Sequence, residues 1–166
     1  MLFACVCCVT FQHLNDIVKV EKETLQPSEF HIGTDALTWL NRALIYNLLF
    51  LQQFLQEYLE WQVSGTTTTT EPLPEDISRH FTFAYEQSLK KHHGWIVQKI
   101  FSLCLMAAPS RGSLLELLGY NGGVNADLPQ ADRVRLITTT VEKYAGRLKG
   151  ATEAVSILLL SHGVQP

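Results

Sequence analysis

The sequence has little charge of either sign, and it lacks the patterns that mark several classes of protein. Charged residues make up 17% of the 166 residues and the net charge is −3, which argues against a surface for nucleic acid or a polybasic membrane patch. No run reaches the ~20 apolar residues that span a bilayer, since Asn47, Gln52 and Gln53 interrupt the longest one. The first ten residues are apolar without a preceding basic region, so we identify no signal peptide.

Motifs for catalysis and metal binding are also lacking. There is no Gly-x-Ser-x-Gly elbow, no glycine-rich phosphate loop and no paired acidic motif, so we expect no enzyme activity. Of the four cysteines, Cys5, Cys7 and Cys8 lie near the N-terminus, without a second pair at zinc-ligand spacing. We expect reduced thiols in a cytoplasmic protein, with no metal or cofactor. A cysteine-dependent enzyme or metal site that uses these thiols with histidines is the alternative.

What the sequence does contain is apolar spacing typical of α-helices. Apolar side chains recur every three or four residues over about 11–25, 35–62, 75–107 and 130–161, and a short helix is predicted over 114–118. Gly33-Thr34-Asp35 is expected to cap the second helix, and Gly94 to lie near a join within the third. Residues 64–74 and 119–129 are predicted loops. No alternation typical of strands is present, so we predict one all-α domain.

A tryptophan and an arginine one helical turn apart form the first candidate binding feature. Trp39 and Arg42 lie at positions i and i+3 of the predicted helix, and Asp35 precedes Trp39 by four residues. An exposed indole beside polar groups can stack on a hexose ring whose hydroxyls need hydrogen bonds. A core tryptophan next to a solvated arginine is the commoner arrangement, so this pair alone does not identify a sugar site.

The second candidate feature is a histidine followed by a glycine and a tryptophan. A histidine ring can donate one hydrogen bond and accept another, so His93 suits an amide or hydroxyl group. Trp95, after Gly94, suits a water–lipid interface, and Lys90 is near enough in sequence to contact lipid phosphates. A metal site is not indicated, because no His-Glu-x-x-His spacing is present. Taken singly, each of these residues more often has a structural role.

Taken together, the two features resemble the glycolipid transfer protein family. The likeness runs from about Phe11 to the C-terminus, and its specific parts are residues 37–46 and residues 90–101, Lys-Lys-His-His-Gly-Trp-Ile-Val-Gln-Lys-Ile-Phe, followed by Ala-Ala-Pro at 107–109. The resemblance implies a two-layer all-α sandwich around a hydrophobic pocket for ceramide chains. It also implies an atypical N-terminal segment, residues 1–10, and a partial glycolipid transfer protein domain, residues 11–166.

The resemblance further implies roles for individual residues. Trp39 would stack on the first sugar, His93 would bind the ceramide carbonyl, and Arg42 would add affinity for an anionic group. Four residues are expected to line the hydrophobic pocket: Tyr46, Phe50, Leu89 and Phe101. Three are expected to contact the membrane: Tyr85, Trp95 and Lys90. Tryptophan at position 39 favours a sugar head group, because relatives that carry phosphosphingolipids have arginine there.

One part of the family pattern has no counterpart in this sequence. The family's head-group clamp includes an Asp-x-x-x-Asn-x-x-Lys helix before the position of Phe11, whereas residues 1–10 contain no Asp, Asn or Lys. The first helices of the domain are therefore expected to be absent. Their loss would remove charge-assisted hydrogen bonds worth ~1.5–3 kcal/mol each, and would expose apolar surface through which the chain could self-associate.

The leading prediction for function is a cytoplasmic carrier that binds a glycosphingolipid and transfers it between membranes. It would touch a membrane transiently, from the surface, and would not bind nucleic acid. One alternative is a non-transporting fragment of the family that senses lipid or binds a protein, which the missing clamp favours. The other alternative is a carrier of the ceramide-1-phosphate type, for which Arg42 would supply the positive charge.

Overall fold

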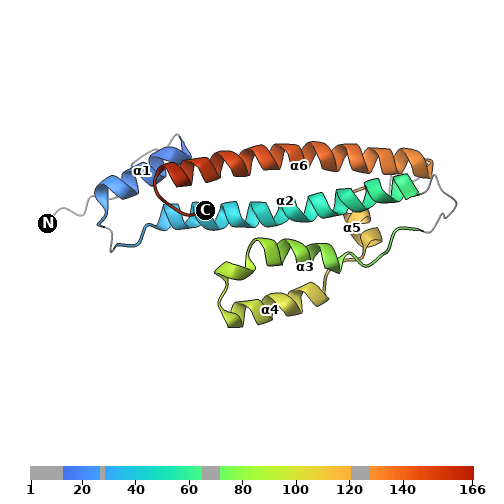
Figure 1. Ribbon diagram of the computed structural model, residues 1–166, viewed down its shortest axis with the longest axis horizontal. Coiled ribbons are helices and arrows are strands. Elements are labelled where there is room, and N and C mark those ends of the chain that lie inside the picture. The colour runs from blue at the N-terminus through green and yellow to red at the C-terminus, as the bar shows by residue number, and fades with distance from the viewer. Residues whose placement is uncertain (1–12, 27–28, 65–71, 121–127) are drawn as a thin grey trace. The chain divides into compact units, whose positions relative to one another are not determined.

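The computed structural model describes residues 13–26, 29–64, 72–120 and 128–166 (Figure 1). Its helices are α1 (Leu14–Thr24), α2 (Ile32–Ser64), α3 (Ser78–Gln87), the 3₁₀ turn η2 (Lys90–His92), α4 (Trp95–Met106), α5 (Arg111–Leu117) and α6 (Gln130–Ser161). No strand occurs among these residues, so the all-α prediction is confirmed. The predicted segment 1–10, which includes Cys5, Cys7 and Cys8, lies outside the described residues. Most of the two predicted loops, 64–74 and 119–129, also lies outside them.

The helix predicted over 75–107 is divided by a turn that ends beside Gly94, as its position suggested. α3 ends at Gln87, η2 follows, and α4 begins at Trp95 after Gly94 as N-cap. The side-chain amide of Gln98 donates hydrogen bonds to the carbonyl oxygens of Lys90, at 2.9 Å, and His93, at 2.8 Å. These two bonds fix the backbone of the turn to the first turn of α4.

The expected cap at residues 33–35 is wrong. α2 begins at Ile32, and the carboxylate of Glu21, on α1, accepts hydrogen bonds from the backbone N–H groups of Gly33 and Thr34 at 2.7 and 2.8 Å. A carboxylate there satisfies free amides and interacts favourably with the helix dipole. Burial opposes ionisation of Glu21, but these hydrogen bonds outweigh it and lower the pKa of the carboxyl group.

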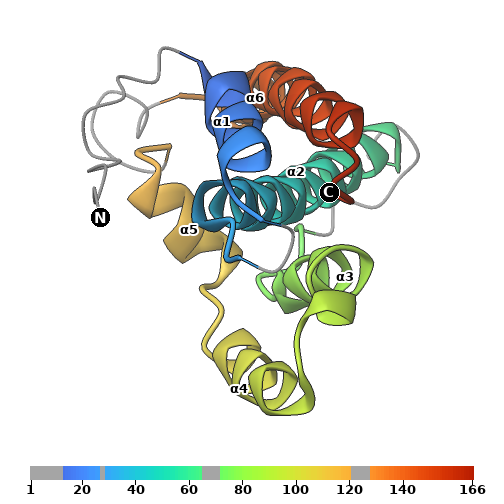
Figure 2. The same ribbon diagram turned by 90° about the vertical axis from the view of Figure 1, so that its left-hand side faces the viewer.

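The chain divides into two compact units, residues 1–41 with 153–166, and residues 42–152. In the first unit α1 lies beside the C-terminal end of α6 (Figures 1 and 2), and Val18, Leu37 and Leu159 form a buried cluster. In the second unit, α3 lies between its part of α2 and α4 in both views. The core of the second unit includes Phe54 and Ile77.

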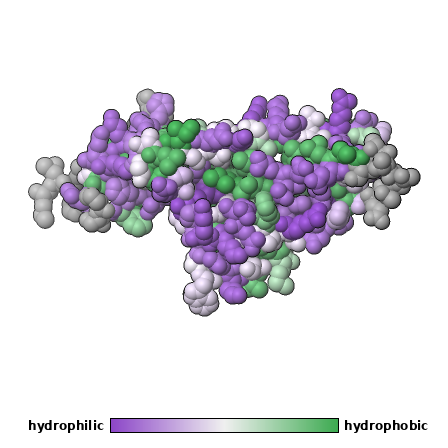
Figure 3. Space-filling model, in the orientation of Figure 1, coloured by the Kyte–Doolittle hydropathy of each residue, from purple (hydrophilic) through white to green (hydrophobic). Residues whose placement is uncertain are grey.

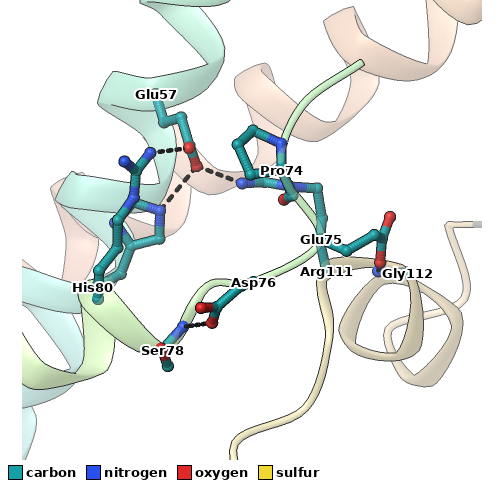
Figure 4. A network of polar contacts seen from close by, with 9 residues as sticks. Glu57, Pro74, Glu75, Asp76, Ser78, His80, Arg111 and Gly112 are labelled. Carbon is teal, nitrogen blue, oxygen red and sulfur yellow. Dashed lines mark hydrogen bonds and ion pairs between the residues drawn. The ribbon is translucent and has the colours of Figure 1, made fainter.

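A buried carboxylate ties three elements of the second unit together (Figure 4). Glu57, on α2, is only 8% exposed. Its Oε1 accepts a hydrogen bond from Arg79, and its Oε2 accepts one from Arg111 and lies 2.7 Å from Nε2 of His80. Arg111 also donates from Nε to the carbonyl oxygen of Pro74 at 2.8 Å. The network therefore holds the starts of α3 and α5 against α2.

α4 presents apolar side chains to solvent. None of its twelve residues is buried, and its large exposed apolar residues are Trp95, Ile96, Val97, Ile100, Leu103 and Met106. The lower edge of Figure 3, where Figure 1 places α4, carries green and white side chains beside purple ones. No single helix among the described residues is long and apolar enough to cross a bilayer, and α4 with α5 passes that test only as a pair bent by 87°.

Candidate functional site

The centre of the candidate site in the second unit is His93, which follows η2. Its backbone is extended, with φ −95° and ψ 131°, and its carbonyl oxygen is held by Gln98. The side chain is therefore carried by a short non-helical segment whose backbone position is fixed on both sides. Such a segment can present a ring to a ligand with little freedom to move.

His93 belongs to a cluster of three rings with Tyr85 and Phe101. The Tyr85 hydroxyl lies 3.2 Å from Nδ1 of His93, and the Tyr85 ring stacks on Phe101 with centroids 3.9 Å apart and an interplanar angle of 8°. The His93 centroid lies 6.2 Å from that of Phe101. Tyr85 is 3% exposed, so this structure does not support the predicted membrane contact; the residue is an interior partner of His93.

A cavity of about 220 Å³ continues from this cluster. It is lined by Tyr46, Phe81, Phe101, Cys104, Leu105, Ala107, Ala108 and Pro109. Tyr46 meets Phe101 edge to face, with centroids 5.8 Å apart. Because ligand pockets generally measure ~300–1,000 Å³, this cavity has room for only part of a large ligand.

Two of the four predicted pocket residues line this cavity and two do not. Tyr46 and Phe101 line the cavity. Phe50 is buried and does not line it, but stacks on Phe81, which does, with ring centroids 4.1 Å apart. Leu89 is buried but does not line this cavity. Phe81 was missed by sequence reasoning, although it precedes Tyr85 by one helical turn and so lies on the same side of α3. That spacing is the signal that could have found it.

The predicted site includes two cationic residues, Arg42 and Lys90, which have different electrostatic partners. Burial, and then the positive charge of Arg42, lowers the pKa of His92, so His92 is neutral at neutral pH. Arg42 therefore lies close enough to His92, in η2, for its charge to act on that ring. Lys90 instead forms an ion pair with Glu86, one helical turn earlier, with Nζ and Oε1 2.8 Å apart. The hydrogen bond from Lys90 to Glu86 raises the pKa of the lysine.

Trp39 belongs to the first unit, within α2. Its side chain is 42% exposed, whereas Thr38 and Asn41 beside it are buried. Asn41 donates from Nδ2 to the hydroxyl of Ser156 at 2.9 Å, which joins α2 to α6 within this unit. The exposed part of this side chain can contact a ligand. Joint action of Trp39 with His93, which lies in the second unit, stays a prediction.

Trp95 is 73% exposed and begins the apolar face of α4. Its amphipathic ring and the apolar residues that follow it suit the boundary between water and lipid. The role of Trp95 in membrane contact stays a prediction.

Comparisons with known proteins relate the chain to one family. The family model described as Glycolipid transfer protein (GLTP) matches residues 7–120. The Glycolipid transfer protein of Danio rerio is 38% identical over 126 residues, which cover 75% of this chain and 55% of the relative. That of Xenopus tropicalis is 38% identical over 137 residues, which cover 80% and 60%. The chain thus spans little more than half the length of these relatives.

A solved structure and a more distant relative extend the comparison. The structure is described as "How FAPP2 Selects Simple Glycosphingolipids Using the GLTP-fold". It matches with a TM-score of 0.70 and 24% identity, over 94% of this chain and 65% of that one, which shows that the two share a fold. Glycolipid transfer protein 1 of Arabidopsis thaliana is 27% identical over 118 residues, 71% of this chain and 51% of the relative.

Proposed function

Because this chain belongs to the glycolipid transfer protein family, we propose that it binds a glycosphingolipid and carries it between membranes. The observation that carries the proposal is the position of His93, a hydrogen-bonding group, beside Phe101, which also lines a largely apolar cavity. A lipid that joins a polar amide to apolar chains matches this change from polar to apolar surroundings.

In this proposal a different residue or cavity binds each part of the lipid. The amide carbonyl accepts a hydrogen bond from the His93 ring, and part of an acyl or sphingoid chain enters the cavity past Phe101. Trp39 stacks on the sugar ring, and Arg42 adds positive charge near η2. Burial of the chain supplies most of the affinity, ~25 cal/mol per Å² of apolar surface, while the polar contacts select the head group.

Contact with the membrane is transient in this proposal. Trp95 and the exposed apolar residues of α4 enter the interface between water and lipid. Lys90 pairs with Glu86 at the surface, and because exposed ion pairs are worth only ~0–1 kcal/mol, the lysine can exchange this partner for a lipid phosphate. The carrier forms no covalent bond with its cargo and works at the cytoplasmic face of membranes.

A second candidate function is lipid or protein binding without transfer. Two observations favour it: the cavity is smaller than a typical ligand pocket, and, within the described residues, the large apolar side chains of α4 are exposed. In this case the α4 face would bind a partner or a second copy of the chain, and the lipid would remain partly exposed. Carriage of a phosphosphingolipid is a third possibility that the same experiment separates.

The test is transfer of fluorescent galactosylceramide, and separately of fluorescent ceramide-1-phosphate, between vesicles by the purified chain. Trp39→Ala and His93→Leu are compared with Tyr144→Ala, which removes an exposed aromatic ring of α6 outside the predicted site. The carrier proposal expects transfer by the unmodified chain and by Tyr144→Ala, and a large loss in the other two variants. A folded, helical protein that transfers no galactosylceramide would refute it. Transfer of ceramide-1-phosphate alone would then indicate a phosphosphingolipid carrier, and transfer of neither lipid would leave binding without transfer.

A further inference from the structure

The bond between Tyr85 and His93 determines which ring nitrogen of His93 carries a proton. The Tyr85 hydroxyl lies 3.2 Å from Nδ1 of His93, and stacking on Phe101 fixes the phenol ring in place. A hydroxyl can either donate to Nδ1 or accept a hydrogen bond from it. The two arrangements leave His93 in opposite tautomers, so the direction of this bond decides what the other ring nitrogen can offer a ligand.

The surroundings of Tyr85 decide the direction. Burial raises the pKa of the Tyr85 hydroxyl, against a smaller opposing effect of Lys90, so the phenol keeps its proton at neutral pH. Among the described residues, Nδ1 of His93 is the hydrogen-bond partner of this hydroxyl. A buried O–H without an acceptor costs ~1–3 kcal/mol. The phenol proton therefore goes to Nδ1, and the neutral His93 ring carries its own proton on Nε2.

We propose that Tyr85 is a positioning residue that holds His93 in the Nε2–H tautomer, so that the ring presents a hydrogen-bond donor. The group it recognises is then an acceptor, such as an amide carbonyl oxygen, and not an amide N–H. This last step rests on the proposed function, whereas the tautomer does not. Phe101 has two roles in this arrangement. It stacks on Tyr85 and so fixes the phenol, and it lines the cavity that would hold the lipid chain.

Histidine nitrogen NMR tests the tautomer directly. Long-range ¹H–¹⁵N spectra of the protein with ¹⁵N-labelled histidine show which ring nitrogen is protonated in each of the six histidines, and His93→Leu assigns the signal of His93. We expect the Nε2–H form in the unmodified protein. A predominantly Nδ1–H ring would overturn the proposal without the need for any variant.

The matched variants are Tyr85→Phe and Tyr46→Phe. The first keeps a ring against Phe101 and removes only the hydroxyl that binds His93; the second removes a hydroxyl from another neighbour of Phe101. We expect Tyr85→Phe to give mixed tautomers and about a two- to tenfold weaker affinity for short-chain galactosylceramide, the loss of one hydrogen bond. Tyr46→Phe should leave the tautomer unchanged.

The outcomes separate this proposal from the function. An unchanged His93 spectrum in Tyr85→Phe would overturn the positioning role. If Tyr85→Phe changes the tautomer but not the affinity for galactosylceramide, the proposal that His93 must donate a hydrogen bond to the lipid is overturned. If the tautomer responds as expected and the unmodified protein binds no galactosylceramide, the positioning role stands and the proposed function fails.

Discussion

Glu57 is the residue whose loss we expect to destabilise the second unit most clearly. Glu57→Gln keeps the size of the side chain and removes its charge, whereas Arg111, whose side chain is 4% exposed, keeps its own. Removing one partner of a buried ion pair costs ~3–5 kcal/mol. Arg111 retains its hydrogen bond to Pro74 and its position over the rings of Phe54 and Tyr58. We therefore expect the lower end, ~3 kcal/mol.

The assay is denaturant unfolding followed by circular dichroism. A loss of ~3 kcal/mol is a large part of the ~5–15 kcal/mol that stabilises a typical domain, so the midpoint should move clearly to lower denaturant. Glu60→Gln is the matched control, because Glu60 is exposed on the same helix and surface substitutions usually stay within ~0.5 kcal/mol. A loss below ~1 kcal/mol for Glu57→Gln would refute the reasoning.

The effect of Glu57 should also depend on pH. Burial opposes its ionisation, but the hydrogen bonds and charges of His80 and Arg111 outweigh burial and lower its pKa below the ordinary 4.5. A carboxyl group whose pKa is lower in the folded state stabilises the fold above its unfolded pKa, and this contribution is lost as the pH falls through the folded pKa. The difference between wild type and Glu57→Gln should shrink below about pH 4.

Three further results are expected. Glu21→Gln should lower the free energy of unfolding by about 1 kcal/mol in denaturant titrations, because the N-terminus of α2 loses a charged cap; no change would contradict that role. Trp95→Ala should weaken sedimentation with vesicles while leaving the helical content unchanged, since Trp95 is exposed; equal sedimentation would exclude it from the membrane contact. With the three N-terminal cysteines replaced by serine, bound lipid should slow alkylation of Cys104, which is exposed and lines the cavity; an unchanged rate would place the chain elsewhere.

The helices were predictable where one local pattern covers the whole element. α6 has the bounds that apolar spacing gave, between Pro129 and the turn at Gly163, whose φ of +71° suits glycine. The start of α2 was not predictable, because its cap comes from Glu21, twelve residues before Gly33. Local sequence can suggest that a helix begins, but not that a distant carboxylate will cap it.

The candidate site was predictable in part, from the resemblance to the family. Tyr46 and Phe101 were expected at the pocket and do line the cavity. Tyr85 was assigned to the membrane because it matches an aromatic position of the family, and its burial was not visible in the sequence. The Glu57 network was missed entirely, since its partners lie 22, 23 and 54 residues away. Spacing along the chain does not report contacts of that kind.

The most direct test of the account is to identify the lipid that the protein extracts. The purified chain is incubated with vesicles containing galactosylceramide, ceramide-1-phosphate and phosphatidylcholine in equal amounts, separated from them, and analysed by mass spectrometry. The account predicts bound galactosylceramide in the unmodified protein and its loss in His93→Leu. Extraction of ceramide-1-phosphate in preference to galactosylceramide, or of no lipid by a folded protein, would contradict it.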